Sequence, residues 1–158
     1  MKKWRDEMET YSQMKYRQQE EVNSCPMMFA FSDKQFDEGM KKLGLEPTDT
    51  DKIYSLGNTG GFIRRSDSEA FGEMLSRHET EMADSIANDK TGDGFIFSMF
   101  DYELANHEYI ITGDVNDTLD ALGLTEDEVN STPALLNGLR LAHNNQLEFH
   151  RQLEEMER

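Results

Sequence analysis

The chain lacks basic residues over a long stretch: no lysine or arginine occurs between Lys90 and Arg140. Ten acidic residues lie in this stretch, namely Asp93, Asp101, Glu103, Glu108, Asp114, Asp117, Asp120, Glu126, Asp127 and Glu128. They supply −10 of the formal net charge of −16. Concentrated carboxylates create a local negative potential that attracts basic partners. Nucleic acids and anionic lipids bind Lys and Arg, so the sequence argues against direct contact with either.

Cysteine and long apolar runs are also scarce. Cys25 is the only cysteine, so no intramolecular disulfide can form, which is typical of a reducing compartment. No run approaches the roughly 20 apolar residues that a membrane helix needs, and no secretory segment follows the basic start. Only three prolines occur beside nine Phe and five Tyr, which argues against disorder. These features predict a folded, cytoplasmic protein that does not contact membranes.

The first half of the chain predicts an arm followed by short strands. Residues 1–24 form the expected helical arm, and residues 25–158 form a single acidic domain. Met27 to Phe31 has the length and character of a strand. Ser32 with Gln35 predicts the capped start of a helix that ends near Gly44. A hairpin is expected around Gly57 to Gly60.

The second half predicts mostly helices. We expect Ser66 to cap one helix and Asp93 to cap another over Phe95 to His107. Tyr109 to Thr112 is β-branched and predicts a strand. Short helices are expected up to Leu122 and from Thr125, whose Glu128 completes a capping box. Pro133 then opens a last helix that reaches about Met156. The fold class is α+β: mostly helical, with a small sheet of short strands and long terminal helices.

One pattern occurs twice. Phe29 to Ser32, a helix and Leu43-Gly44-Leu45 parallel Ile110 to Thr112, a helix and Leu122-Gly123-Leu124. Glycine between leucines is a common helix ending. The pattern indicates either a structural duplication or two ordinary helix ends.

The terminal helices carry apolar residues with no obvious internal partner. The last helix has a heptad-like stripe whose final members are Phe149, Leu153 and Met156. The arm offers Trp4, Met8 and Tyr11 at similar spacing. We expect these six residues to pack together, within one chain or between two copies in a homodimer.

Strong catalytic motifs are missing. The chain has no Gly-x-Ser-x-Gly, His-Glu-x-x-His or Cys-x-x-Cys. Histidine and carboxylates crowd only at His107 with Asp101, Glu103 and Glu108, where a metal-assisted enzyme is one alternative and a helix-ending histidine the simpler one. Asp89 to Gly94 weakly resembles a calcium loop, but Phe100 stands where the terminal glutamate belongs. No metal, cofactor or catalytic residue is therefore predicted.

Five segments carry a resemblance to a known family. They are Phe29-Ala30-Phe31-Ser32 with Gly39, Leu43-Gly44-Leu45, Gly60-Gly61-Phe62-Ile63-Arg64, Tyr102-Glu103-Leu104-Ala105-Asn106-His107-Glu108-Tyr109 and Leu119-Asp120-Ala121-Leu122-Gly123-Leu124. On these segments the chain resembles small acidic proteins of unknown function from phages and mobile elements of gut bacteria. The resemblance implies a mobile-element origin and brings no catalytic residues.

Charge and resemblance together predict a non-enzymatic binding protein. The ten acidic residues would occupy the basic surface of a partner protein, such as a host defence or nucleic-acid-binding protein, and inhibit it as a nucleic-acid mimic. An assembly protein that acts through its terminal helices is the other alternative.

Overall fold

A computed structural model describes residues 8–157 and confirms the mostly helical α+β class. The described residues form two compact units. We call residues 18–81 the sheet unit, and residues 8–17 with 82–157 the helical unit. The boundaries fall inside α2 (Tyr11–Asn23) and α4 (Ser68–Asn88). This grouping differs from the predicted arm of residues 1–24 and domain of residues 25–158, because each of these helices contributes residues to both units.

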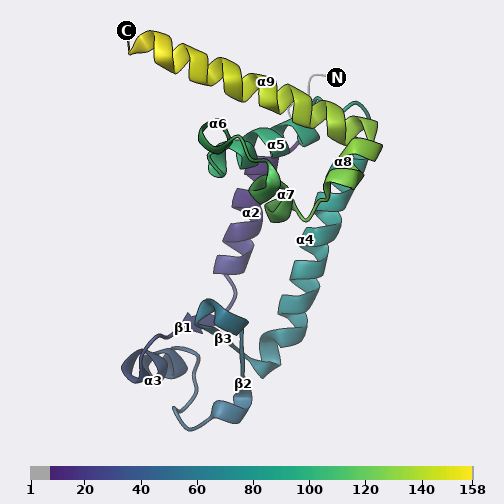
Figure 1. Cartoon of the computed structure of the whole chain (residues 1–158). Coiled ribbons are helices and arrows are strands. Elements are labelled where there is room, and N and C mark those ends of the chain that lie inside the picture. Colours follow the sequence, from purple (N-terminus) through teal and green to yellow (C-terminus); the bar gives the residue numbers. More distant parts are fainter. Residues whose placement is uncertain (1–7, 158) are drawn as a thin grey trace. The chain divides into compact units, whose positions relative to one another are not determined.

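The sheet unit holds three short antiparallel strands in the order β1–β3–β2 (Figure 1). The strands are β1 (Met27–Phe29), β2 (Ile53–Ser55) and β3 (Gly61–Arg64). β2 and β3 form the predicted hairpin, with a 3-10 turn at Gly57–Thr59 between them. A second such turn, Thr50–Lys52, precedes β2. The expected strand at Met27 and the hairpin are confirmed.

A small core joins the sheet to α3 (Asp33–Lys42). Met28 of β1 packs against buried Met40 and Leu43. The close approach requires glycine at position 39, since a Cβ there would lie 2.6 Å from the Met28 sulfur. Gly39 therefore fixes the distance between α3 and β1.

Two of the predicted helix caps, at Ser32 and Thr125, are present. Ser32 Oγ accepts the Gln35 backbone N–H, as predicted. The expected cap at Ser66 is wrong, because residues Arg65–Asp67 form a 3-10 turn and α4 begins only at Ser68.

The helical unit is built on α5 (Phe95–Asn106) and α9 (Pro133–Met156), which run beside each other (Figure 1). Phe100 and Leu104 of α5 and Ala142 of α9 are fully buried. Met14 of α2 completes this core. The remaining elements are α6 (Tyr109–Thr112), α7 (Asn116–Leu122) and α8 (Glu126–Ser131).

The predicted strand at Tyr109–Thr112 is wrong: these residues form the helical turn α6. Glu108, at φ 53°, and Gly113, at φ 69°, bound the turn. Tyr109 stacks edge-on against His143 of α9, and its hydroxyl lies 2.8 Å from Nδ1 of that ring. Tertiary contact with α9 therefore overrides the β-propensity of this segment.

The repeated pattern is a shared helix ending. Leu45 N–H donates to Met40 C=O, and Leu124 N–H donates to Leu119 C=O, so both glycines occupy the C′ position of the same motif. The segments that precede the helices differ, since one is β1 and the other α6. The structure gives no support to a duplication.

The side chain of Asp89, rather than that of the expected Asp93, accepts the backbone N–H groups at the start of α5. The cap position is Gly94, which has no side chain. The buried Asp89 carboxylate accepts the backbone N–H groups of Gly92, Gly94 and Ile96, each at 3.0 Å. Asp93 is exposed, and among residues 8–157 its side chain accepts a hydrogen bond only from the Thr91 hydroxyl. In the loop that resembles a calcium site, the Asp89 carboxylate thus binds backbone N–H groups.

The Thr125 N-cap of α8 supports one prediction. Thr125 Oγ1 accepts the Glu128 N–H at 3.1 Å and lies 3.2 Å from the Glu128 carboxylate. Thr125→Ala removes this acceptor and should lower the free energy of unfolding by about 1 kcal/mol in urea denaturation. Thr125→Ser keeps the hydroxyl and should stay close to the wild type; equal losses in both variants would contradict a capping role.

None of the helices that the structure describes is long and apolar enough to cross a membrane.

Candidate functional site

Eight of the ten predicted interaction residues are exposed carboxylates of the helical unit. Most lie on α7, on α8 and in the loops that precede these helices. The eight are Asp93, Glu108, Asp114, Asp117, Asp120, Glu126, Asp127 and Glu128. We call them the exposed acidic set. Chain connectivity, with α7 followed directly by α8, keeps six of them within a segment of 15 residues, from Asp114 to Glu128.

No member of the exposed acidic set forms an ion pair within residues 8–157, whereas several acids elsewhere do. Glu9 pairs with Arg17 at 2.8 Å, and Glu148 pairs with Arg151 at 2.6 Å. Some members have local roles: Asp114 accepts the Asn116 N–H, and three lie in the first turn of α8. Such contacts do not remove the charge. The set therefore presents uncompensated negative charge to solvent.

The other two predicted residues face inward on α5. Asp101 accepts hydrogen bonds from Asn145 at 2.9 Å and from Gln146 at 2.8 Å, both on α9. Glu103 is only 2% exposed, and its carboxylate lies 3.4 Å from Lys15 Nζ and 3.5 Å from His107 Nε2. Glu103 is therefore buried between helices, and Asp101 is half-buried at the contact between α5 and α9.

Buried Glu103 is the centre of a partly buried polar cluster that joins α2 to α5. Burial, followed by the neighbouring Glu103 carboxylate, raises the pKa of the Tyr11 phenol, which therefore stays protonated. Lys15 Nζ lies 5.3 Å from the centre of the Tyr102 ring and 5.5 Å from that of Tyr11. A buried carboxylate needs such partners. Sequence reasoning missed Lys15 because it lies 88 residues from Glu103.

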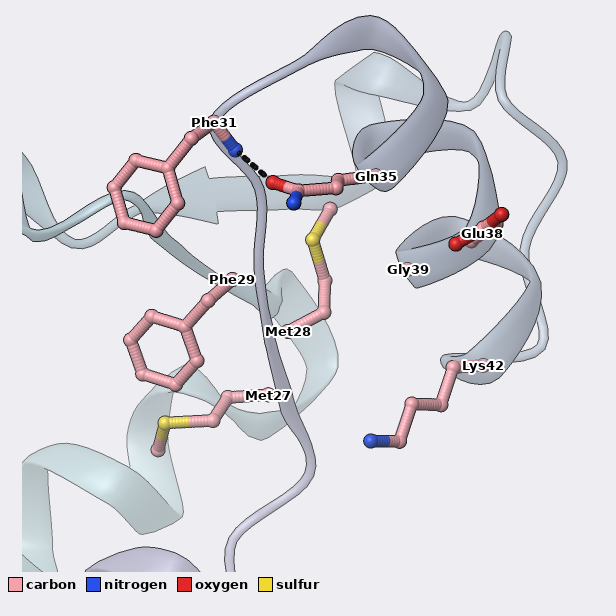
Figure 2. A pocket seen from close by; sticks show the side chains of 8 residues that line it. All are labelled: Met27, Met28, Phe29, Phe31, Gln35, Glu38, Gly39 and Lys42. Carbon is pink, nitrogen blue, oxygen red and sulfur yellow. Dashed lines mark hydrogen bonds between the residues drawn. The ribbon is translucent and has the colours of Figure 1, made fainter.

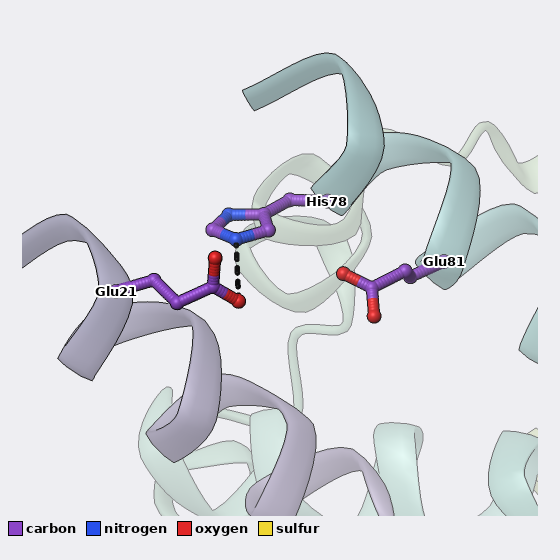
Figure 3. A group of neighbouring side chains, drawn as sticks. All are labelled: Glu21, His78 and Glu81. Atoms are coloured by element: carbon purple, nitrogen blue, oxygen red, sulfur yellow. Dashed lines mark ion pairs between the residues drawn. The ribbon is translucent and has the colours of Figure 1, made fainter. Parts of the chain in front are cut away.

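The residues of the enzyme alternative do not converge. His107 contacts Glu103, but Asp101 is turned toward α9, and Glu108 is exposed. Within residues 8–157, a different group is the one that brings three metal-ligating side chains together: Glu21, His78 and Glu81 in the sheet unit. Figure 3 shows the His78 ring beside both carboxylates. Sequence reasoning missed this group because Glu21 is remote; the His78-x-x-Glu81 spacing is the only local signal.

An open hollow of about 430 Å³ lies between β1 and α3 (Figure 2). Met27, Phe29 and Phe31 line one side, while Gln35, Glu38, Gly39 and Lys42 of α3 line the other. Phe31 is 78% exposed, and its backbone N–H donates to the Gln35 side chain at 2.7 Å. β1 is an edge strand, so its outer main-chain groups are available for pairing.

The residues expected to pair the terminal helices have separate environments. Trp4 lies outside the described residues. Tyr11 is buried in the helical unit against Phe95 and Tyr102, at ring distances of 6.0 and 5.5 Å. Met8 is exposed, as are the three residues at the end of α9, Phe149, Leu153 and Met156. Homodimerisation through the exposed residues stays a prediction.

The comparisons with known proteins identify a family but no function. The model of a family of unknown function, DUF7659, matches residues 10–145. No curated protein and no solved structure matches the chain. The match includes Glu21, His78, Glu81 and the whole exposed acidic set, and it ends before Phe149. The predicted resemblance is confirmed to this extent. The chain belongs to the family of unknown function DUF7659.

Proposed function

We propose that the protein binds a basic partner protein through the exposed acidic set of its helical unit. The proposal rests on one observation: none of these eight carboxylates is ion-paired within the described residues. Several acids elsewhere are neutralised locally, as Glu148 is by Arg151. Long-range attraction by uncompensated charge speeds association and selects partners of opposite sign.

Nucleic-acid-binding proteins are the partner class that fits this charge best. Their grooves concentrate Lys and Arg to neutralise the dense phosphates of a duplex. A chain with a net charge of −16 would occupy such a groove and exclude nucleic acid. Inhibition of a host defence protein, a phage or mobile-element origin and a cytoplasmic location belong to this proposal.

A charge-matched pair of variants tests the proposal. The first, D117N/D120N/E126Q/D127N, removes four charges from the exposed acidic set. The second, D37N/E38Q/E69Q/E73Q, removes four charges from exposed positions of the sheet unit. Both change the formal net charge from −16 to −12. Only the position of the lost charge differs between them.

We expect wild-type protein to capture a basic protein from a bacterial lysate at low salt and to release it at high salt. The first variant should capture at least about tenfold less, since removing several charges weakens a steered encounter. The second should capture as the wild type does. Equal losses in both variants would show that total charge alone matters and would refute a dedicated surface. Circular dichroism melting confirms that each variant is folded.

A further inference from the structure

The side chain of His78 is buried with one ring nitrogen unsatisfied. His78 is 8% exposed, and its Nε2 atom forms no hydrogen bond in the described structure. The Glu21 carboxylate faces this nitrogen, with its Oε1 at 3.5 Å. A buried polar atom without a hydrogen bond costs about 1–3 kcal/mol. Such an atom is retained where a ligand or a function uses it.

The surroundings of this nitrogen are those of a metal site. His78 and Glu81 lie three residues apart on α4, which places both on one face of the helix. Glu21 approaches from α2, and the three ligand atoms lie within 4.8 Å of one another. One imidazole and two carboxylates are a donor set that transition-metal ions accept, with positions left open for water. Pairs of a histidine and a glutamate at this helical spacing bind metals in helix bundles.

Arg77 already supplies positive charge to these carboxylates. Its guanidinium forms an ion pair with Glu21 and another with Glu81 at 3.1 Å. The hydrogen bond from Arg77, with a smaller contribution from His78, holds the pKa of the Glu21 carboxyl below its usual value. The Glu21 carboxyl is therefore kept ionised, as a metal ligand must be. The Arg77 side chain is 48% exposed, so it can move into solvent when a divalent cation binds the two carboxylates.

We propose that Glu21, His78 and Glu81 bind a divalent transition-metal ion such as zinc, in competition with Arg77 for the two carboxylates. The buried imidazole selects against magnesium and calcium, which prefer oxygen ligands alone. All three ligands belong to the sheet unit, so the site is independent of the proposed partner surface of the helical unit.

Calorimetric titration of the full chain with zinc chloride tests the site. A millimolar background of magnesium would occupy exposed carboxylates that bind cations without selectivity. The wild type should bind one zinc ion, and His78→Ala should weaken binding by about tenfold or more. His150→Ala is the matched control: His150 also lies near an acid on its own helix, Glu154 of α9, and its loss should change nothing. Arg77→Gln should tighten binding because it removes the competing cation.

Cobalt substitution gives a second readout that does not depend on affinity. Cobalt bound by His78 should produce visible absorption bands that Glu81→Gln reduces and His78→Ala abolishes. No zinc binding below millimolar concentration would overturn the proposal. Equal binding by His78→Ala and His150→Ala would overturn it as well, since the ion would then bind elsewhere. Weaker binding by Arg77→Gln would refute the competition.

Discussion

Gly92→Ala is expected to destabilise the helical unit by about 3 kcal/mol or more, because two costs add. Gly92 has a φ of +86°, where a residue with a Cβ loses about 1–2 kcal/mol. The added Cβ would also lie 1.9 Å from the Ala134 carbonyl oxygen. That atom belongs to the backbone of α9, so relief requires the helix itself to move away from the loop. Urea denaturation followed by far-ultraviolet circular dichroism measures the loss.

Gly113→Ala separates the two costs. Gly113 also has a positive φ, of +69°, but an added Cβ would meet no atom within 4 Å. This variant should lose only the conformational part, about 1–2 kcal/mol. If the two alanine variants were equally stable, the close approach of the loop to α9 would not constrain the fold as described.

Asp89→Ala is expected to cost about 3 kcal/mol, since three buried or partly buried N–H groups lose their acceptor at once. The carboxylate binds them at the start of α5, where a negative charge also favours the helix dipole. Thermal and urea denaturation should both show the loss.

Asp93→Ala is the control within the same loop. Asp93 is exposed and bonds the Thr91 hydroxyl, so its removal should change stability by less than about 0.5 kcal/mol. A greater loss for Asp93→Ala than for Asp89→Ala would restore Asp93 as the cap and contradict the structure.

Local interactions explain why much of the fold could be predicted. The caps at Ser32 and Thr125 join residues three positions apart, and the helix ends at Gly44 and Gly123 involve six consecutive residues. The turn between β2 and β3 is equally local. Tyr109–Thr112 could not be assigned, because its contact with His143 on α9 decides its conformation. Asp89 was missed for a related reason: it caps α5 from outside the usual position.

The same distinction applies to the candidate sites. The absence of lysine and arginine is a property of the sequence, so the acidic segment could be found without a structure. Whether each acid is exposed depends on packing: Glu103 is buried because α2 brings Lys15 beside it. Glu21 and His78 come together only because α2 and α4 contact one another within the sheet unit. The spacing of these residues along the sequence does not indicate that contact.

The salt dependence of partner affinity tests the central claim most directly. With a purified partner, the dissociation constant would be measured for the wild type and both charge variants between about 50 and 200 mM salt. We expect wild type and the sheet-unit variant to lose affinity steeply and in parallel. The variant of the exposed acidic set should bind more weakly at low salt and respond less to added salt. Parallel curves for all three proteins would contradict the claim that these carboxylates form the binding surface.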